Sequence, residues 1–378
     1  MKVGVVGASG YAGVELLRLC AGHPDLDVVV ATAGGHRGDA VGEHTPSLAA
    51  AYPALTYAAT EPSELDGLDL VFLALPHGQS QHLAPDLIPR VGVLVDLAAD
   101  FRLSDPSLYP VWYGEPHVAP ELLDRFVYGL PELHRDELRG ARLIAAPGCY
   151  PTAALLALDP LVRAGVLAVP QGPGPGPGQG SDTGPHQGSD TGPEPGPHAS
   201  HASDAPALIV DAASGVSGAG RAPKDTLHFG TVDEDFVAYG LLDHRHTAEM
   251  EQGLGVPVLF TPHLAPMARG ILATCYARPA DGGADGVLSG GGAMDLLHRA
   301  YDDEPFVVVT DRPPSTKATS GSNCAHVTVR VDPRTGWVVA LASLDNLVKG
   351  ASGQAVQCAN LALGLPEGSG LPVVGIYP

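Results

Sequence analysis

The sequence predicts an α/β protein with two domains, a doubly wound parallel sheet followed by an α+β domain whose sheet is mixed or largely antiparallel. In the first 100 residues, short apolar runs alternate with helical patterns. In the second half, many strand-like runs follow one another with few helices between them. A chain of 378 residues is long enough to bury two separate cores of this kind.

The first half supplies the evidence for the parallel sheet. Strands are expected at 2–7, 27–33, 68–76 and 91–100, with a helix at 13–23. Their Val- and Leu-rich runs are nearly continuous, which indicates strands buried on both faces. This pattern is typical of a doubly wound fold.

The second half supplies the evidence for the other sheet, because alternation along residues 325–332 indicates one face that is more exposed than the other. A last helix at 350–365 is expected to return to the first domain. We therefore predict one domain from 1–148 plus 350–378 and a second from 149–349. The strands expected in the second domain are 207–214, 258–266, 270–279, 306–310, 325–332 and 337–345.

Residues 171–206 form a Gly- and Pro-rich insertion that contains a duplication, "GSDTGPHQ" followed by "GSDTGPEP". Such a segment buries too little apolar surface to offset its chain entropy, so we predict a disordered loop. A metal site on its histidines is not expected, because a mobile loop does not hold ligands in place.

Composition excludes several functional classes. The formal net charge of −21 argues against a nucleic-acid-binding protein, and no apolar run is long enough to span a membrane. The first residues, "MKVGVVGASG", are typical of a strand and a glycine turn rather than a signal peptide. Five irregularly spaced cysteines form neither a disulfide framework nor a zinc motif. A cytoplasmic protein is therefore expected.

The segment "VGASGYAG" carries a candidate nucleotide site. It places Gly7, Gly10 and Gly13 directly after a strand and at the start of a helix. Glycines there let backbone amides approach a pyrophosphate, and the helix N-terminus adds partial positive charge. The GxxGxxG spacing differs from the usual GxGxxG, so a tight turn without a ligand remains an alternative.

The end of the second strand indicates which nucleotide would bind. NAD sites usually carry an acidic residue there, but this chain has Thr32, Gly34, Gly35 and then Arg37. A missing carboxylate with an arginine nearby favours a 2′-phosphate, and hence NADP(H). By residue type alone, a solvated loop arginine is equally compatible with this position.

Cys149 is the candidate nucleophile. In "RLIAAPGCYPTAALLAL", Gly148 allows a sharp turn and Pro151 suits the first turn of a helix that runs to about Leu158. The helix dipole there favours a thiolate by at most about 2 kcal/mol, whereas lowering the thiol pKa by two units needs about 2.7 kcal/mol. A second cation or a base is therefore expected nearby. Three other cysteines lie in patterns typical of core positions, namely Cys20, Cys275 and Cys358. The fourth, Cys324, has no obvious activating neighbour.

The segment "LLDHRHTAEMEQ" is the candidate source of that base. His244 and His246 precede a predicted helix that Thr247 can cap, with Arg245 between the histidines. Two histidines at this spacing are also half of a zinc site, but no further ligands complete it, so no metal is expected. A structural histidine near a helix cap is the other alternative.

Eight segments together resemble the N-acetyl-gamma-glutamyl-phosphate reductase family, over the whole chain except the insertion. They are "GASGYAG", "FLALPHG", "ADFRL", "YGLPEL", "PGCYPTAALLAL", "SGVSGAGR", "HRHTAEMEQ" and "DNLVKGASGQAVQ". Related semialdehyde dehydrogenases acting on aspartyl phosphate or on carrier-linked substrates are the competing enzymes. A nucleotide-binding regulator without turnover is a third reading.

The resemblance implies an NADP-binding Rossmann domain, a catalytic and oligomerisation domain, and a homodimer or homotetramer. It implies NADPH-dependent reduction of N-acetyl-L-glutamyl 5-phosphate through a cysteine thioester, a step of arginine biosynthesis. Cys149 matches the nucleophile and His244 the acid/base. The remaining implied positions are Ser9, Tyr11, Ala12, Pro76, Ser214, Gly215 and Asn346 toward the cofactor, and Arg102, Arg221 and Arg245 toward the substrate carboxylate and phosphate.

Overall fold

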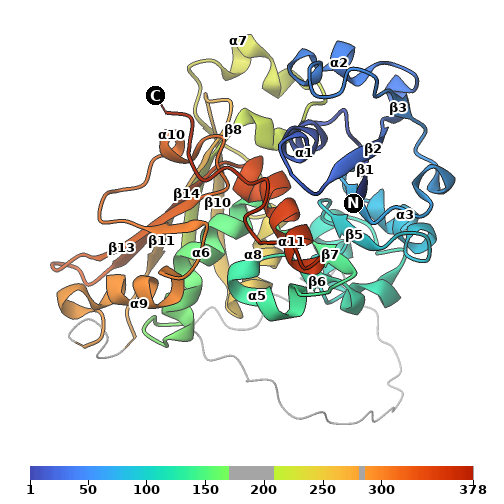
Figure 1. Cartoon of the computed structure of the whole chain (residues 1–378). Coiled ribbons are helices and arrows are strands. Elements are labelled where there is room, and N and C mark those ends of the chain that lie inside the picture. Colours follow the sequence, from blue (N-terminus) through green and yellow to red (C-terminus); the bar gives the residue numbers. More distant parts are fainter. Residues whose placement is uncertain (170–207, 281–285, 378) are drawn as a thin grey trace, which may run out of the picture.

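A computed structural model describes residues 1–169, 208–280 and 286–377 of the chain (Figure 1). The insertion predicted to be disordered, 171–206, lies outside these residues. The described part forms two seven-stranded sheets that lie side by side, with helices between and around them.

The first sheet is entirely parallel, with the order β3-β2-β1-β4-β5-β7-β6. Its order reverses between β1 and β4, and ligands in such folds bind at the carboxyl ends of the strands that flank this point. The predicted doubly wound sheet is therefore confirmed. The strands are β1 Lys2–Val6, β2 Asp27–Thr32, β3 Tyr57–Ala58, β4 Leu70–Leu73, β5 Val93–Asp96, β6 Val127–Tyr128 and β7 Leu143–Ala145.

The central strands of this sheet are buried on both faces, as their continuous apolar runs indicated. Along β4, Leu70 and Phe72 belong to one core cluster, whereas Val71 and Leu73 belong to a second one. Each successive side chain points to the opposite face, so both faces must be covered. The helices of this part are α1 Tyr11–Ala21, α2 Val41–His44, α3 Ser80–Leu87, α4 Leu108–Tyr113, α5 Pro131–Leu138 and α11 Gly353–Ala362.

The second sheet has the order β12-β13-β14-β11-β8-β10-β9 and is mixed. The pairs β8–β10 and β12–β13 are parallel, and the other neighbouring pairs are antiparallel. This agrees with the prediction of a mixed or largely antiparallel sheet. Its strands are β8 Leu208–Gly215, β9 Val237–Ala238, β10 Val258–Ala265, β11 Ile271–Ala277, β12 Val307–Val309, β13 Ala325–Val331 and β14 Val338–Leu344.

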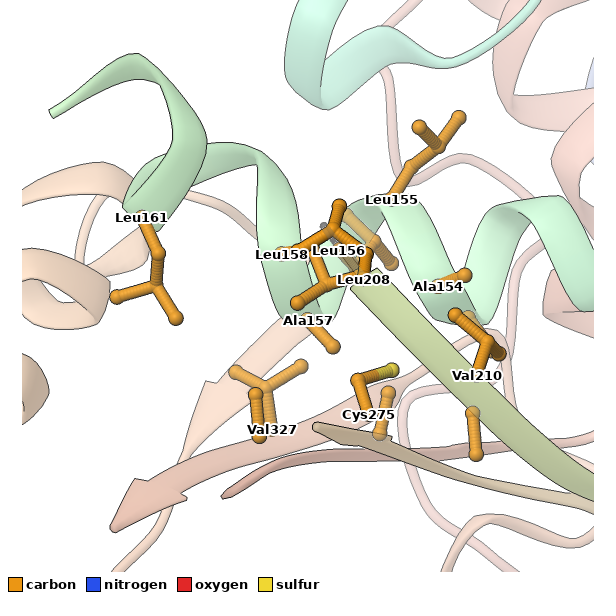
Figure 2. Close-up of a cluster of buried hydrophobic side chains, with 14 of the residues drawn as sticks. Ala154, Leu155, Leu156, Ala157, Leu158, Leu161, Leu208, Val210, Cys275 and Val327 are labelled. Carbon is orange, nitrogen blue, oxygen red and sulfur yellow. The ribbon is translucent and has the colours of Figure 1, made fainter. Parts of the chain in front are cut away.

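Helix α6, Cys149–Arg163, carries the candidate nucleophile at its first residue and is nearly all buried. Its leucines and alanines pack on the second sheet, where Val210 and Cys275 face them (Figure 2). The helix is thus anchored in the second core, and the position of its N-terminus is set by that packing. The other helices of this part are α7 Phe229–Val232, α8 His246–Leu254, α9 Gly292–Tyr301 and α10 Thr316–Thr319.

The C-terminal helix returns to the first sheet, because Val356 and Cys358 of α11 belong to the same core cluster as β1 and β4. The predicted regular helix at 350–365 is wrong at its start, where a π-helical turn, Val348–Ser352, precedes α11. The Asp345 carboxylate accepts backbone hydrogen bonds from Leu347 and Val348 and so fixes this turn. The exact domain boundaries at 148/149 and 349/350 stay a prediction.

Candidate active site

The glycine turn after β1 has the geometry of a nucleotide cradle. Gly7 has φ of +79°, and a Cβ there would lie 2.4 Å from the Ala74 carbonyl oxygen. A Cβ on Gly13 would lie 2.3 Å from the Gly7 carbonyl oxygen, so glycine is needed at both positions. Helix α1 begins at Tyr11, two residues earlier than predicted. The turn and the start of α1 thus pack closely against each other, and their backbone N–H groups can hydrogen-bond to a ligand.

A cavity of about 470 Å³ opens directly over this turn. Ser9, Gly10, Gly34 and Pro76 are among its lining residues. No carboxylate follows β2, and Thr32 instead hydrogen-bonds to Thr60 through their hydroxyls. These residues fit a dinucleotide, because the cavity lies at the carboxyl ends of parallel strands beside a helix N-terminus.

A second cavity, of about 660 Å³, connects the turn with the candidate nucleophile. Tyr11 and Ala12 line it on the first domain. Cys149, His246 and Asn346 line it further along. Five of the eleven predicted cofactor residues therefore line the same cavity as the thiol: Gly10, Tyr11, Ala12, Pro76 and Asn346.

A third cavity, of about 730 Å³, lies on the other side of the thiol. Cys149, His244 and Arg245 line it together with Lys224 and Tyr239. Cys149 thus faces both a space suited to the cofactor and a space suited to a substrate.

Cys149 is the first residue of α6, with Gly148 as the N-cap, so the thiol lies at the predicted helix N-terminus. The helix runs to Arg163, beyond the predicted end near Leu158. The thiol keeps part of its surface exposed, unlike the other four cysteines. Gly350 of the π-turn packs directly on it, since a Cβ at Gly350 would lie 2.7 Å from the Cys149 Cβ. The helix start and the π-turn together fix the thiol.

The thiol is not a resting thiolate, contrary to the expected effect of the helix dipole. Burial raises the pKa of Cys149 to about 11, and the Arg102 guanidinium and the backbone N–H groups of the first turn offset only part of this. The desolvation of the site outweighs the nearby positive charge. Removal of the proton therefore needs a base.

Glu249, on α8, contacts three groups around the thiol through its carboxylate. One carboxylate oxygen accepts hydrogen bonds from the Gly148 N–H at 2.7 Å and the Tyr128 hydroxyl at 2.8 Å. The other lies 3.4 Å from Arg102. Arg102 also donates to the carbonyl oxygens of Ala146 and Leu97, so each of its three nitrogens already has a protein acceptor. Its charge acts on the thiol, and the residue also lines the 660 Å³ cavity beside Cys149.

The two histidines lie together at the start of α8. The predicted cap is wrong: Arg245 is the N-cap residue, and the Thr247 N–H donates to the His244 carbonyl oxygen. His244 Nδ1 accepts a hydrogen bond from the His246 N–H at 3.2 Å, so a neutral His244 carries its proton on Nε2. Burial lowers the pKa of His244 to about 4, which keeps it neutral at pH 7 as predicted.

His246 lies directly against the N-terminus of the helix that carries the nucleophile. A Cβ on Gly148 would lie 2.5 Å from His246 Nε2, so the ring lies against the N-cap of α6. Burial lowers the pKa of His246 well below its usual value. Both imidazoles are therefore neutral at neutral pH, but the acceptor nitrogen of His244 is already occupied by the His246 N–H, so His246 is the better placed proton acceptor.

Ser214 and Asn346 line the two cavities beside the thiol, whereas Gly215 lines neither of them. The Asn346 amide accepts from the Gly270 N–H at 2.7 Å and donates to Ser217 Oγ at 2.9 Å, which leaves the side chain fixed beside the cofactor-side cavity. Ser214 lines the substrate-side cavity. Gly215 lies behind them, where a Cβ would meet the Arg269 backbone at 2.8 Å.

Three predicted arginines have different surroundings. Arg245 is exposed and lines both large cavities. Arg221 donates to the Ser9 carbonyl oxygen at 2.7 Å on the nucleotide turn, and it also lines the 660 Å³ cavity that Cys149 lines. Arg37 is exposed and has no hydrogen bond or ion pair with any residue that the structure describes.

Two further residues were not predicted from the sequence. Lys224 lines both cavities beside the thiol, and Glu249 links α8 to α6. The signal for Glu249 was available, since it lies one helical turn after His246 in "HRHTAEME". Among the described residues, no group of three or more His, Cys, Asp or Glu side chains is arranged to hold a metal ion.

Comparison with known proteins agrees with this geometry. Residues 2–141 match a family profile described as semialdehyde dehydrogenase, NAD binding domain. Residues 196–346 match one described as semialdehyde dehydrogenase, dimerisation domain. N-acetyl-gamma-glutamyl-phosphate reductases of Desulforudis audaxviator and Symbiobacterium thermophilum are each 43% identical to this chain, over 100% of its length and 100% and 99% of theirs.

The chain belongs to the N-acetyl-gamma-glutamyl-phosphate reductase family. A member from Pseudomonas aeruginosa is 41% identical over the full length of both chains. The predicted membership is therefore confirmed.

Solved structures extend the likeness in fold. Aspartate semialdehyde dehydrogenase II of Vibrio cholerae, complexed with ASA, has a TM-score of 0.63 at 15% identity and covers 96% of this chain and 98% of its own. The Candida albicans enzyme, solved with NADP, has a TM-score of 0.60 at 15% identity and covers 95% and 97%. These structures share the two-domain architecture.

Proposed function

We propose that the protein reduces N-acetyl-L-glutamyl 5-phosphate with NADPH to N-acetyl-L-glutamate 5-semialdehyde and phosphate, a step of L-arginine biosynthesis. The named reductases that align with the chain from end to end support this reaction. The observation that carries the proposal is the position of Cys149, which lines both the cofactor-side and the substrate-side cavity. A reduction through a thioester needs the sulfur at such a junction.

The cofactor NADP(H) would be held by the glycine turn, with the pyrophosphate on the backbone of Gly7–Gly13 and the N-terminus of α1. Pro76 and Asn346 would border the nicotinamide. Bound NADPH supplies the hydride. The absence of a carboxylate after β2 supports NADP(H) rather than NAD(H).

Cys149 acts as the nucleophile. Because its thiol is protonated at rest, a neutral imidazole must accept the proton as the sulfur attacks the γ-carbonyl carbon. His246 lies against Gly148 and is the closer of the two rings to the helix start. The carbon–sulfur bond forms, the carbon–oxygen bond to phosphate breaks, and the imidazolium returns its proton to the departing phosphate.

His244 assists the second half of the reaction. Its Nε2–H can donate a hydrogen bond to the oxyanion of the tetrahedral carbon that forms when the thioester is reduced, and the proton stays on the ring. The N–H groups at the start of α6 add further hydrogen bonds to such an oxygen. When the carbon–sulfur bond breaks, the oxyanion becomes the aldehyde carbonyl, and the released Cys149 thiolate takes up a proton from solvent through the neighbouring imidazole.

The substrate carries a carboxylate and a phosphate, and the protein has a net charge of −21. Local cations must therefore offset the overall field. Arg245 and Lys224 line the space on both sides of the thiol and can meet these two anions. The Arg102 guanidinium adds a further positive charge next to the thiol.

The test is an assay of the purified protein in the reverse direction, with phosphate and NADP⁺. N-acetylglutamate semialdehyde is expected to be oxidised much faster than aspartate semialdehyde. Faster oxidation of aspartate semialdehyde would instead assign the protein to the related dehydrogenases. Turnover of neither aldehyde, by protein that still binds NADP⁺, would favour a regulator.

The protein also assembles as a homodimer or homotetramer through the second sheet. Residues along β8, β10 and β11 alternate between buried and partly exposed, and Leu259 and Tyr276 are 38% and 37% exposed. The family profile described as a dimerisation domain covers this sheet. Leu259→Asp combined with Tyr276→Asp is expected to yield monomers in sedimentation. An unchanged sedimentation coefficient would exclude this surface.

A cytoplasmic location completes the proposal. All five cysteines lie in the described part of the chain and none is in a disulfide, as is usual in reducing compartments. Within residues 1–169, 208–280 and 286–377, no helix is both long and apolar enough to cross a bilayer. Cell fractionation tests the location, and recovery in an extracytoplasmic fraction would contradict it.

A further inference from the structure

Arg221 reaches from the second domain to the nucleotide turn of the first. It follows β8 and the short helical turn Val216–Ala219, and its guanidinium donates to the Ser9 carbonyl oxygen at 2.7 Å. Ser9 lines the cavity over the glycine turn. Arg221 also lines the cavity that contains Cys149, so this contact adds a position at the edge of the cofactor site to the one that the motif predicted near the substrate.

Two imidazoles lie at the same edge. His36 ends the short helical turn Gly34–His36 directly after β2, and His44 ends α2. Their ring centroids are 4.0 Å apart. Gly34 of this turn lines the same cavity as Ser9, which Arg221 contacts, so the rings and the guanidinium border one space. Burial lowers the pKa of His44, and the charge of Arg221 lowers it further.

The hydrogen-bonding capacity of this group is only partly used. His44 Nε2 is a buried atom with no hydrogen-bond partner in the described part of the protein. His36 Nδ1 lies 3.3 Å from Asp39 Oδ2, which leaves its Nε2 free of that contact. Arg221 is exposed, and its hydrogen bond to Ser9 occupies a single guanidinium nitrogen. The group therefore keeps several donors for an anion.

This position matches one phosphate of NADP(H) in particular. In doubly wound folds the adenosine ribose lies at the end of the second strand, where NAD-specific proteins use a carboxylate. Here the strand is followed by Ala33, Gly34 and Gly35, so nothing acidic opposes a phosphate until Asp39. Guanidinium groups bind phosphate through two parallel hydrogen bonds.

We propose that Arg221, together with His36 and His44, forms the subsite that binds the 2′-phosphate of NADP(H). This proposal rests on the proposed function, and it assigns cofactor selectivity to a residue of the second domain. Because Ser9 and the imidazoles belong to the first domain, the phosphate joins the two domains at this edge. Arg37, from the same loop as His36, then contributes less than Arg221 to binding of the 2′-phosphate.

The test measures equilibrium binding of two probes, adenosine 2′,5′-bisphosphate and adenosine 5′-monophosphate, by calorimetry on the full chain. The probes differ only in the 2′-phosphate. Arg221→Gln is expected to weaken binding of the bisphosphate at least ten-fold and that of the monophosphate less than three-fold. His44→Gln is expected to give a smaller loss in the same direction. An unchanged ratio of the two affinities in Arg221→Gln overturns the proposal.

Two variants serve as controls. Lys224→Gln removes a cation three residues further on that lines the cavities without a contact to Ser9, and it is expected to keep the ratio. An equal loss in Lys224→Gln would show a general charge effect and overturn the subsite. A loss in Arg37→Gln without one in Arg221→Gln would also overturn it. Failure of the proposed reaction appears separately, as absent turnover of the semialdehyde by protein that still discriminates the probes.

Discussion

Glu249 Oε1 accepts a hydrogen bond from the Gly148 N–H at 2.7 Å, across 101 residues of sequence. Through this contact, the helix that carries the histidines holds the N-cap of the helix that carries Cys149. Glu249 is completely buried and also faces Arg102 at 3.4 Å. The nucleophile, the histidines and the nearest guanidinium are therefore positioned by one carboxylate.

Glu249→Gln tests this arrangement. The neutral amide leaves Arg102 buried without its counter-charge, and loss of one partner of such a pair destabilises a protein by about 3–5 kcal/mol. The negative charge of Glu249 also raises the pKa of Cys149, so the thiol of the variant is expected to titrate at lower pH. Urea unfolding and the pH profile of thiol alkylation measure the two effects.

Glu251→Gln, on the same helix, is the matched control for that variant. Its side chain accepts the Val258 N–H, which a glutamine oxygen can still do, so both measurements are expected to change little. Equal destabilisation by the two variants would contradict a special role for Glu249.

The resting state of Cys149 gives a second prediction. With a pKa of about 11, the thiol is expected to react with iodoacetamide roughly 300-fold more slowly at pH 7 than a free cysteine, whose pKa is about 8.5. The rate should rise with pH toward a midpoint near 11. Cys149→Ser gives the background from the four buried cysteines. A midpoint at or below pH 8 in the free protein would show that the thiol is already activated.

Gly350→Ala is expected to impair catalysis more than folding. The new Cβ would lie 2.7 Å from the Cys149 Cβ, so the π-turn or the thiol must move. Overpacking of this kind destabilises by about 1–3 kcal/mol, and a displaced nucleophile is expected to lower kcat at least ten-fold.

Gly22→Ala, at the end of α1, is the control for Gly350→Ala. Its Cβ would come no closer than 3.7 Å to the nearest atom, so kcat and stability are expected to stay close to those of the native protein. A native kcat in Gly350→Ala would show that the contact with Cys149 is not needed for turnover.

Asp96, at the end of β5, gives a prediction on stability. Burial raises its pKa to about 7, and the neighbouring Asp100 charge adds to this. The folded protein therefore keeps a proton between about pH 4 and 7 that the unfolded chain has lost, so this contribution to stability decreases as pH rises through that window. The slope is at most about 1.4 kcal/mol per pH unit.

Asp96→Asn removes that titration. The free energy of unfolding of the variant, measured in urea at pH 5 and pH 7.5, is expected to differ less between the two pH values than that of the native protein. An equal pH dependence in both proteins would show that Asp96 is ionised in the folded state at pH 5.

The features that could be predicted from the sequence are those that depend on a few neighbouring residues. The glycine spacing at Gly7–Gly13 and the Gly-Cys-Tyr-Pro helix start are contained in a few neighbouring residues, and their geometry follows from the backbone. The continuous strands of the first sheet and the alternating strands of the second were predicted for the same reason. The two-residue strands β3 and β9 were not, because they exist only through pairing with distant strands.

The charges at the site could not be predicted in the same way. The thiol pKa depends on desolvation by the π-turn and α8, which are far from Cys149 in sequence, and this burial outweighs the helix dipole. Arg221 hydrogen-bonds to Ser9, 212 residues away, a contact that its motif did not indicate. Such placements depend on how the two domains pack, and no single motif contains that information.

The most direct test of the account is to mix the protein with N-acetylglutamyl 5-phosphate in the absence of NADPH, quench with acid and analyse the peptides by mass spectrometry. The account predicts one N-acetylglutamyl thioester per chain on the peptide that contains Cys149, and none in Cys149→Ser. Product formation by the native protein with NADPH, without any acylated Cys149 peptide in the quenched reaction, would contradict it.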